Sequence, residues 1–242
     1  MMKKKILASL LVGSAVVGAS LAPLSAQATT TGTTPVTVGF EGGTLPDGNG
    51  DPNTVDPDPT KPNSNFDLLF IPREYDFGKL SISDDLTKPI PNKRDEGLNG
   101  GTEAVGVGDL RGTKEGWHLT AQSTEMKSGN ESLQGRITTN LGRYLLQYDE
   151  TNNTYVSISS GVVAEETKPQ IPTPINWSLP LGGEAVLIAN ASKGQGQGLW
   201  RFTMLTPSLN ITTPYQQIKT GNYTGTITWN LVAGPSTPAP SN

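Results

Sequence analysis

The chain has 242 residues, a formal net charge of −4 and 17% charged residues, and it contains no cysteine. This length fits one domain of about 200 residues, or one domain with a mobile segment. The lack of cysteine excludes disulfide bridges, thiolate metal sites, a thiol nucleophile and a lipid-modified N-terminal cysteine. The acidic balance argues against nucleic acid as a partner, because a polyanion requires a basic surface that displaces its counterions.

Residues 1–28 have the order of a secretory signal peptide. Three lysines at positions 3–5 precede an apolar stretch over 6–24, and the small-residue pattern Ala26, Gln27, Ala28 follows it. We predict cleavage after Ala28, because a membrane-spanning helix would not need such a cleavage pattern. The remaining chain, 29–242, loses three lysines, so its formal net charge changes from −4 to −7.

An acidic segment rich in Pro, Gly, Asn and Asp follows over residues 42–65. Its few apolar residues cannot bury enough area to offset the entropy of ordering the chain. We therefore predict a flexible, solvated insertion here, and a second mobile connection over 165–174. The run that starts at Asp47 is similar to a calcium loop, but its twelfth position holds Asp58 where the EF-hand pattern requires glutamate. No metal site and no cofactor is predicted.

The rest of the chain consists of short stretches in which apolar and polar residues alternate, separated by glycine. Trp117, Leu119 and Ala121 alternate with polar neighbours, and a similar pattern occupies 155–163, 185–191, 199–205 and 223–232. This period of two, with many β-branched residues, is typical of half-buried strands. We expect an all-β protein with a single β-sandwich-like domain.

Two Trp-x-Leu tripeptides lie far apart, at 117–119 and 229–231. On a strand, the indole and the leucine share one face and the middle residue points to the other. Such a face suits either the core of a sandwich or stacking on a sugar ring, and the sequence leaves both roles open. A third copy at 177–179 lacks the surroundings of the other two, and we interpret it as ordinary packing.

The surroundings of the first two tripeptides form fuller motifs, which comprise Asp109, Arg111, Gly112 and Gly116 before the first, Tyr223 and Thr228 before the second, and Pro235 after it. With these motifs the chain resembles the WxL cell-wall-binding surface proteins of Gram-positive bacteria. The stretch 66–80 and the residues Gly196, Gly198 and Trp200 extend the resemblance, which covers essentially the whole chain.

The resemblance implies a non-catalytic surface protein that binds the cell wall non-covalently, with peptidoglycan as the ligand. The protein would be located at the cell surface after signal peptide cleavage. An alternative that the resemblance also implies is an adhesion or assembly subunit, docking a membrane-anchored WxL-interacting protein or host extracellular matrix proteins. The motif residues carried over as wall-binding are Trp117, Leu119, Trp229, Leu231, Asp109, Arg111 and Tyr223.

Asp109 and Arg111 are two residues apart, so on a strand they share a face, and we predict an ion pair beside Trp117. This pair either contacts the wall or supports the fold.

Few residues favour hydrolytic chemistry. His118 is the single histidine, it is expected to point to solvent, and no G-x-S-x-G motif accompanies it. Adjacent acidic pairs such as Asp84 with Asp85 face opposite ways on a strand, whereas a glycosidase needs two carboxyls across one cleft. We expect a binding protein and not an enzyme.

Overall fold

The computed structural model describes residues 31–93, 101–173 and 175–236. The chain divides into two units, Met1–Gly39 and Phe40–Asn242. In the first unit, the described residues 31–39 are exposed and belong to no strand or helix. The predicted leader and its cleavage site lie outside the described residues. Across the described ranges, no helix is long and apolar enough to cross a membrane.

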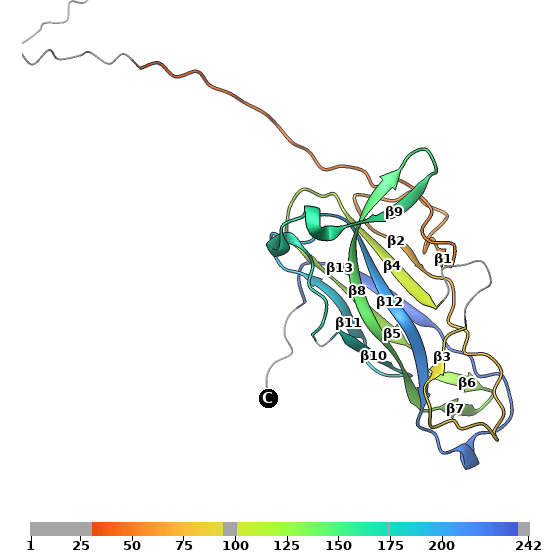
Figure 1. Ribbon diagram of the computed structural model, residues 1–242. Coiled ribbons are helices and arrows are strands. Elements are labelled where there is room, and N and C mark those ends of the chain that lie inside the picture. The colour runs from red at the N-terminus through yellow and green to blue at the C-terminus, as the bar shows by residue number, and fades with distance from the viewer. Residues whose placement is uncertain (1–30, 94–100, 174, 237–242) are drawn as a thin grey trace, which may run out of the picture. The chain divides into compact units, whose positions relative to one another are not determined.

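The second unit is almost entirely β structure, and its largest sheet has eight strands (Figure 1). Six of them follow the order β1-β2-β4-β12-β8-β10, while β3 pairs with β12 and β9 pairs with β8. The strands are β1 (Thr54–Val55), β2 (Phe66–Pro72), β3 (Ile90–Pro91), β4 (Thr102–Asp109), β8 (Gly135–Asp149), β9 (Thr154–Ile158), β10 (Asn176–Pro180) and β12 (Gly198–Ile211). All pairings between neighbouring strands are antiparallel.

A second sheet has three strands in the order β11-β5-β13, and β6 and β7 form a hairpin. Their bounds are β5 (Trp117–Ser123), β6 (Met126–Ser128), β7 (Glu131–Leu133), β11 (Val186–Ala191) and β13 (Ile227–Ala233), and short 3-10 helices occupy Ser160–Val162, Glu165–Thr167 and Tyr215–Gln217. Buried side chains from the three-stranded and eight-stranded sheets form one hydrophobic cluster. The prediction of an all-β, sandwich-like domain is therefore confirmed.

Burial along β5 follows the alternation in the sequence. Trp117, Leu119 and Ala121 are fully buried, whereas the polar residues between them are half-buried or exposed. The Trp117 indole meets the ring of Phe202 on β12 edge to face, with 5.9 Å between centroids and 76° between planes. This aromatic contact joins the inner faces of the two sheets.

The eight-stranded sheet is buried on its other face as well, at a second hydrophobic cluster that comprises Leu45, Leu69, Phe70, Ala104, Leu146 and Tyr155. On β4, Val105 and Val107 belong to the inner core, and Gly106 and Gly108, which alternate with them, leave room on the opposite face of this sheet. A Cβ atom on Gly106 would lie 2.5 Å from the Phe70 ring. The Val-Gly alternation of β4 thus allows side chains to pack closely over this face.

The segment 42–65 is only partly solvated, which corrects the expectation of a wholly solvated insertion. Residues 55–62 are exposed, but Leu45 is 2% exposed and Asn53 is buried. Arg201 of β12 donates a 2.8 Å hydrogen bond from Nη1 to Asp51 Oδ1, and these side chains are 11% and 12% exposed. One buried leucine and this ion pair together help to offset the ordering entropy.

The connection after residue 164 also has more contacts than a mobile linker would require. Lys168 is buried, and Gln170 exchanges two backbone hydrogen bonds with Asn190 of β11, at 2.7 and 2.8 Å. Arg143 of β8 donates to the Pro169 carbonyl at 2.6 Å. Residues 165–170 are therefore tied to both sheets, because the two sheets supply the partners for their backbone.

Candidate functional site

The two Trp-x-Leu tripeptides lie side by side on neighbouring strands, as a sandwich could arrange them. In the antiparallel pairing of β13 with β5, Leu231 is opposite Leu119, Trp229 is opposite Ala121, and Ala233 is opposite Trp117. Opposed residues of an antiparallel pair point to the same side of the sheet. Both tripeptides therefore contribute to one face, although more than a hundred residues separate them.

That shared face is the inner one. Trp117 and Leu119 are fully buried, Trp229 is 9% exposed, and Leu231 is half-buried against the core. Of the two roles that the sequence left open for the indoles, the structure shows the core role. Stacking of these rings on a sugar would require them to leave the sandwich.

The Trp117 indole is fixed by a carbonyl that it shares with a second tryptophan. Trp117 Nε1 and Trp200 Nε1 each donate a 3.0 Å hydrogen bond to the Gly196 carbonyl. Gly196 has a φ of +79°, and a Cβ atom there would lie 2.5 Å from Trp117 Nε1. Only glycine fits at this position, because any other residue would be strained at this φ and its Cβ atom would collide with the indole.

The predicted ion pair between Asp109 and Arg111 is confirmed, and it is buried. Arg111 donates from Nε to Asp109 Oδ1 at 2.9 Å and from Nη2 to Oδ2 at 2.8 Å, with side chains 11% and 3% exposed. Its guanidinium lies 3.7 Å from the centroid of the Phe66 ring. Arg111 Nη2 also donates to the Gly116 carbonyl, which accepts the backbone N–H of Gly234 as well. The motif residues of both tripeptides thus meet at one carbonyl.

Tyr223 is half-buried and packs against the main hydrophobic cluster. Its hydroxyl donates a 3.1 Å hydrogen bond to the Lys219 carbonyl. The third tripeptide lies on β10, where Trp177 and Leu179 are buried and Trp177 Nε1 donates to the Leu187 carbonyl at 2.9 Å. The interpretation of this third copy as ordinary packing is confirmed.

A model of the family described as "WxL domain surface cell wall-binding" matches residues 27–235. The chain belongs to the WxL family. Comparison with curated proteins and with solved structures finds no match. Membership makes this chain a cell-wall-binding surface domain, and the family is one of binding domains. The motifs that carried the resemblance in the sequence are the ones that meet inside the sandwich.

The opposite side of the three-stranded sheet of this WxL domain is turned outward, and we call it the outer face. Its rows follow from the register: Thr120 lies between Leu187 and Asn230, and His118 lies between Asn190 and Val232. Gln122 and Thr228 form the next pair. Sequence reasoning did not single out these residues, although they are the alternate positions of the strands that it predicted.

His118 is half-buried, so the expectation of a solvent-facing histidine holds only in part. Its Nδ1 lies 2.9 Å from the Gly234 carbonyl, and this contact ties β5 to the end of β13. In the parts of the chain that the structure describes, no group of three or more His, Cys, Asp or Glu residues is placed to hold a metal ion.

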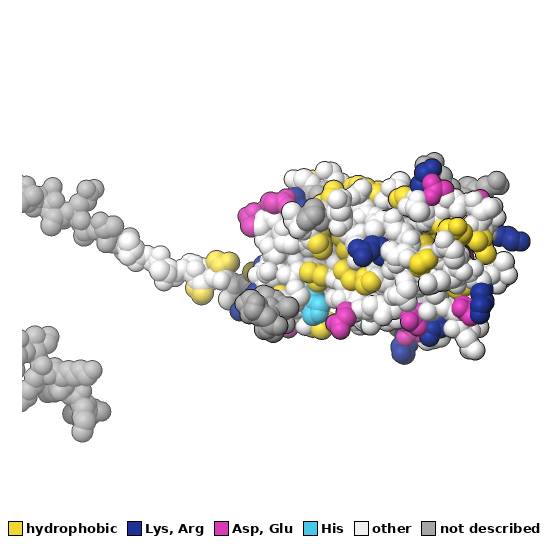
Figure 2. All heavy atoms as spheres, turned by 90° about the horizontal axis from the view of Figure 1, so that it is seen from below, with side chains coloured by type: hydrophobic (Ala, Val, Ile, Leu, Met, Phe, Trp, Pro, Cys, Tyr) yellow, Lys and Arg dark blue, Asp and Glu magenta, His cyan; other side chains and the backbone are white. Residues whose placement is uncertain are grey.

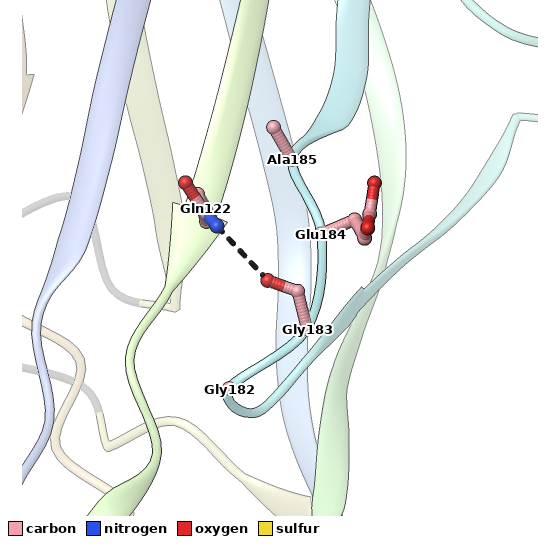
Figure 3. A pocket seen from close by; sticks show the side chains of 5 residues that line it. All are labelled: Gln122, Gly182, Gly183, Glu184 and Ala185. Atoms are coloured by element: carbon pink, nitrogen blue, oxygen red, sulfur yellow. Dashed lines mark hydrogen bonds between the residues drawn. The ribbon is translucent and has the colours of Figure 1, made fainter.

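At one end of the outer face lies a shallow hollow of about 570 Å³, lined by Gln122, Gly182, Gly183, Glu184 and Ala185. Gln122 Nε2 donates a 3.1 Å hydrogen bond to the Gly183 carbonyl, and Figure 3 shows this bond spanning from β5 to the loop before β11. Figure 2 shows one side of the molecule, where acidic and basic side chains, several of them adjacent to one another, are surrounded by uncharged surface and hydrophobic areas. The outer face of the WxL domain is therefore largely uncharged, and the hollow at its end is shallow.

Proposed function

We propose that the mature chain binds peptidoglycan non-covalently through the outer face of the β11-β5-β13 sheet. The observation that carries the proposal is the position of the family motifs. Trp117, Leu119, Trp229 and Leu231 all lie on the inner face of this one sheet, directly beneath the outer face. A motif that packs beneath one surface maintains the shape of that surface.

The chemistry of the outer face suits a glycan carrying hydroxyl and N-acetyl groups. Strands β5, β11 and β13 contain no Asp, Glu, Lys or Arg. Thr120, Gln122 and Asn230 present hydroxyl and amide groups, which both donate and accept hydrogen bonds. An uncharged face also lets a protein of net charge −7 approach an anionic envelope without local repulsion.

In this proposal the motif residues contribute to wall binding only indirectly, by supporting the sheet that carries the outer face. The Asp109–Arg111 pair and the Gly116 carbonyl hold the start of β5 against the end of β13, and the indoles fill the layer beneath. Loss of either tripeptide would weaken wall binding by disordering the sheet, because the strands that carry the outer face would lose their core.

The test is co-sedimentation of the purified chain 29–242 with peptidoglycan stripped of protein and of teichoic acid. The chain should sediment with this material, and muramidase-released fragments should compete for it. Retention on intact walls but not on stripped peptidoglycan would contradict direct recognition. That outcome would favour the alternative of an adhesion or assembly subunit held by a membrane-anchored partner or a host matrix protein. Mass spectrometry of the secreted protein should find Thr29 at its N-terminus.

A further inference from the structure

The segment 35–41, with the sequence Pro-Val-Thr-Val-Gly-Phe-Glu, has the pattern of a strand but pairs with no strand in the part of the chain that the structure describes. Val36, Val38 and Phe40 alternate with small or polar residues, and they are 92%, 78% and 94% exposed. A period of two is the signature of a strand with one buried face. Three large apolar side chains on one side of an unpaired segment indicate a surface that is covered in use.

The free edge of β13 offers backbone groups for such a strand. Thr124 N–H donates to the Thr226 carbonyl and Gly234 N–H donates to the Gly116 carbonyl, so the even-numbered residues of this stretch point their backbone groups toward β5. The backbone N–H and C=O groups of the odd-numbered residues therefore point away from β5, to the free edge of β13. These residues are Ile227, Trp229, Leu231 and Ala233. Among the described residues, β13 pairs with β5 alone.

The side chains at the β13 edge match those of the segment 35–41 in apolar character. Ile227 and Leu231 are half-buried on the inner side of the sandwich, and β13 contacts β2 of the opposite sheet, where Phe66 and Leu68 are half-buried. A strand added beside β13 would place alternate side chains over these residues. Neither β13 nor the stretch 35–40 carries a charge, so the pairing brings no like charges together.

We propose that residues 35–41 of one molecule add as a strand to the β13 edge of a second copy. One chain holds both halves of the contact, an unpaired segment of seven residues with a strand-like pattern and the free edge of the seven-residue strand β13. Residues 35–40 and β13 carry no charge, which fits a contact between two copies of a protein whose remaining net charge of −7 opposes other contacts between copies. Main-chain hydrogen bonds would supply the attraction, and the alternating apolar side chains would set the register. Reciprocal exchange gives a two-fold dimer, and one-way addition gives longer assemblies.

Single cysteines test the contact cleanly, because the natural chain contains none. Thr37 and Asn230 would both lie on the outward side of the proposed strand pair, so Thr37→Cys and Asn230→Cys would place two thiols on the same side of it. When the two purified variants are mixed under mild oxidation, the mixed disulfide should form at least tenfold faster than a disulfide between Thr37→Cys and a control variant, Thr60→Cys. Thr60 is exposed and lies in a turn outside every strand. Equal rates with Asn230→Cys and Thr60→Cys would overturn the proposal.

Sedimentation velocity supplies the second measurement. The chain 29–242 should populate dimers or larger assemblies at tens of micromolar, and the double variant Val36→Asp, Val38→Asp should be monomeric. At submicromolar concentration, where both are monomeric, the two proteins should unfold at the same temperature, because Val36 and Val38 are exposed. A monomeric natural chain, or a Thr37→Cys, Asn230→Cys double variant that closes its disulfide within one chain, would show that a second copy is not the occupant.

Discussion

At the scale of single residues, the Trp-x-Leu tripeptides act as packing elements whose polar atoms are satisfied internally. Trp117 is fully buried, yet its indole N–H has a partner in the Gly196 carbonyl at 3.0 Å. An unpaired buried donor would cost about 1–3 kcal/mol, so the position of this carbonyl matters as much as the ring. Gly196 is thus part of the motif in space although it lies far from both tripeptides in sequence.

Gly196→Ala should lower the free energy of unfolding by about 2–4 kcal/mol. Strain at a positive φ contributes about 1–2 kcal/mol, and overpacking against Trp117 and Ala191 contributes the rest. Gly194→Ala is the matched control, because Gly194 has a φ of +91° and open space around its Cβ position. Urea unfolding should show a loss of only about 1 kcal/mol for the control. Equal losses would mean that the contact with Trp117 contributes nothing.

Arg111→Met should destabilise the domain by about 3–5 kcal/mol, because it leaves the Asp109 carboxylate buried without its partner. The double variant Asp109→Asn, Arg111→Met should regain part of this loss, since it removes the unpaired charge. Thermal and urea unfolding of the two single variants and the double variant give the coupling energy. If the effects of the single variants simply add, the pair is not coupled in the way its bidentate geometry indicates.

At the scale of elements, segments that are poor in apolar residues are held by a few specific contacts. Asp51→Ala should release the segment around Leu45 from the eight-stranded sheet, because Arg201 would lose its buried partner. Limited proteolysis should then cut within 43–55 at least tenfold faster, while strands β5 and β13 keep their protection from hydrogen exchange. Asp58→Ala, at an exposed turn of the same segment, should leave the cutting rate unchanged. A similar rate for both variants would mean that this ion pair does not hold the segment.

The connection after β9 carries a pH-dependent contact. Hydrogen bonds from Lys168 and Arg143 lower the pKa of Glu165 from its ordinary value of 4.5 to about 2. A depressed carboxyl pKa stabilises the folded state above pH 4.5, and this stabilisation is lost as the pH falls from about 4.5 to 2. The natural chain should therefore be more stable than Glu165→Gln at pH 6, and the two should converge near pH 2. Urea unfolding across this range checks it, and a difference independent of pH would contradict it.

Strands and their buried sides were predictable where the order of neighbouring residues alone determines them. The alternation at 117–121 gave the buried and exposed sides of β5, and the spacing of Asp109 and Arg111 gave their pairing. The burial of Leu45 was not predictable, because it depends on Gly108 of the distant strand β4 leaving room for this side chain in the second hydrophobic cluster. The role of the indoles was also beyond the sequence, since a strand face shows the same alternation whether it meets a core or a ligand.

At the scale of the whole molecule, we propose that the sandwich separates packing and wall binding onto the two sides of one sheet. The inner side carries the motifs by which the family is recognised, and the outer side carries uncharged hydroxyl and amide groups. Variants of the tryptophans would change fold and binding together, so they cannot locate the binding surface. Exposed positions on the outer face can be changed without removing any core contact.

The most direct test is the affinity of the variant Gln122→Val, Asn230→Val for stripped peptidoglycan. Both residues are exposed on the outer face, and the variant Asn140→Val, Gln147→Val removes the same two amides from exposed positions of β8. Losing two hydrogen bonds of about 0.5–1.5 kcal/mol each should weaken binding by about tenfold, and loss of the bond from Gln122 to the Gly183 carbonyl should lower the free energy of unfolding by only about 1 kcal/mol. The β8 variant should bind as the natural chain does. Full binding by the outer-face variant, or equal loss by both, would contradict the assignment of wall binding to this face.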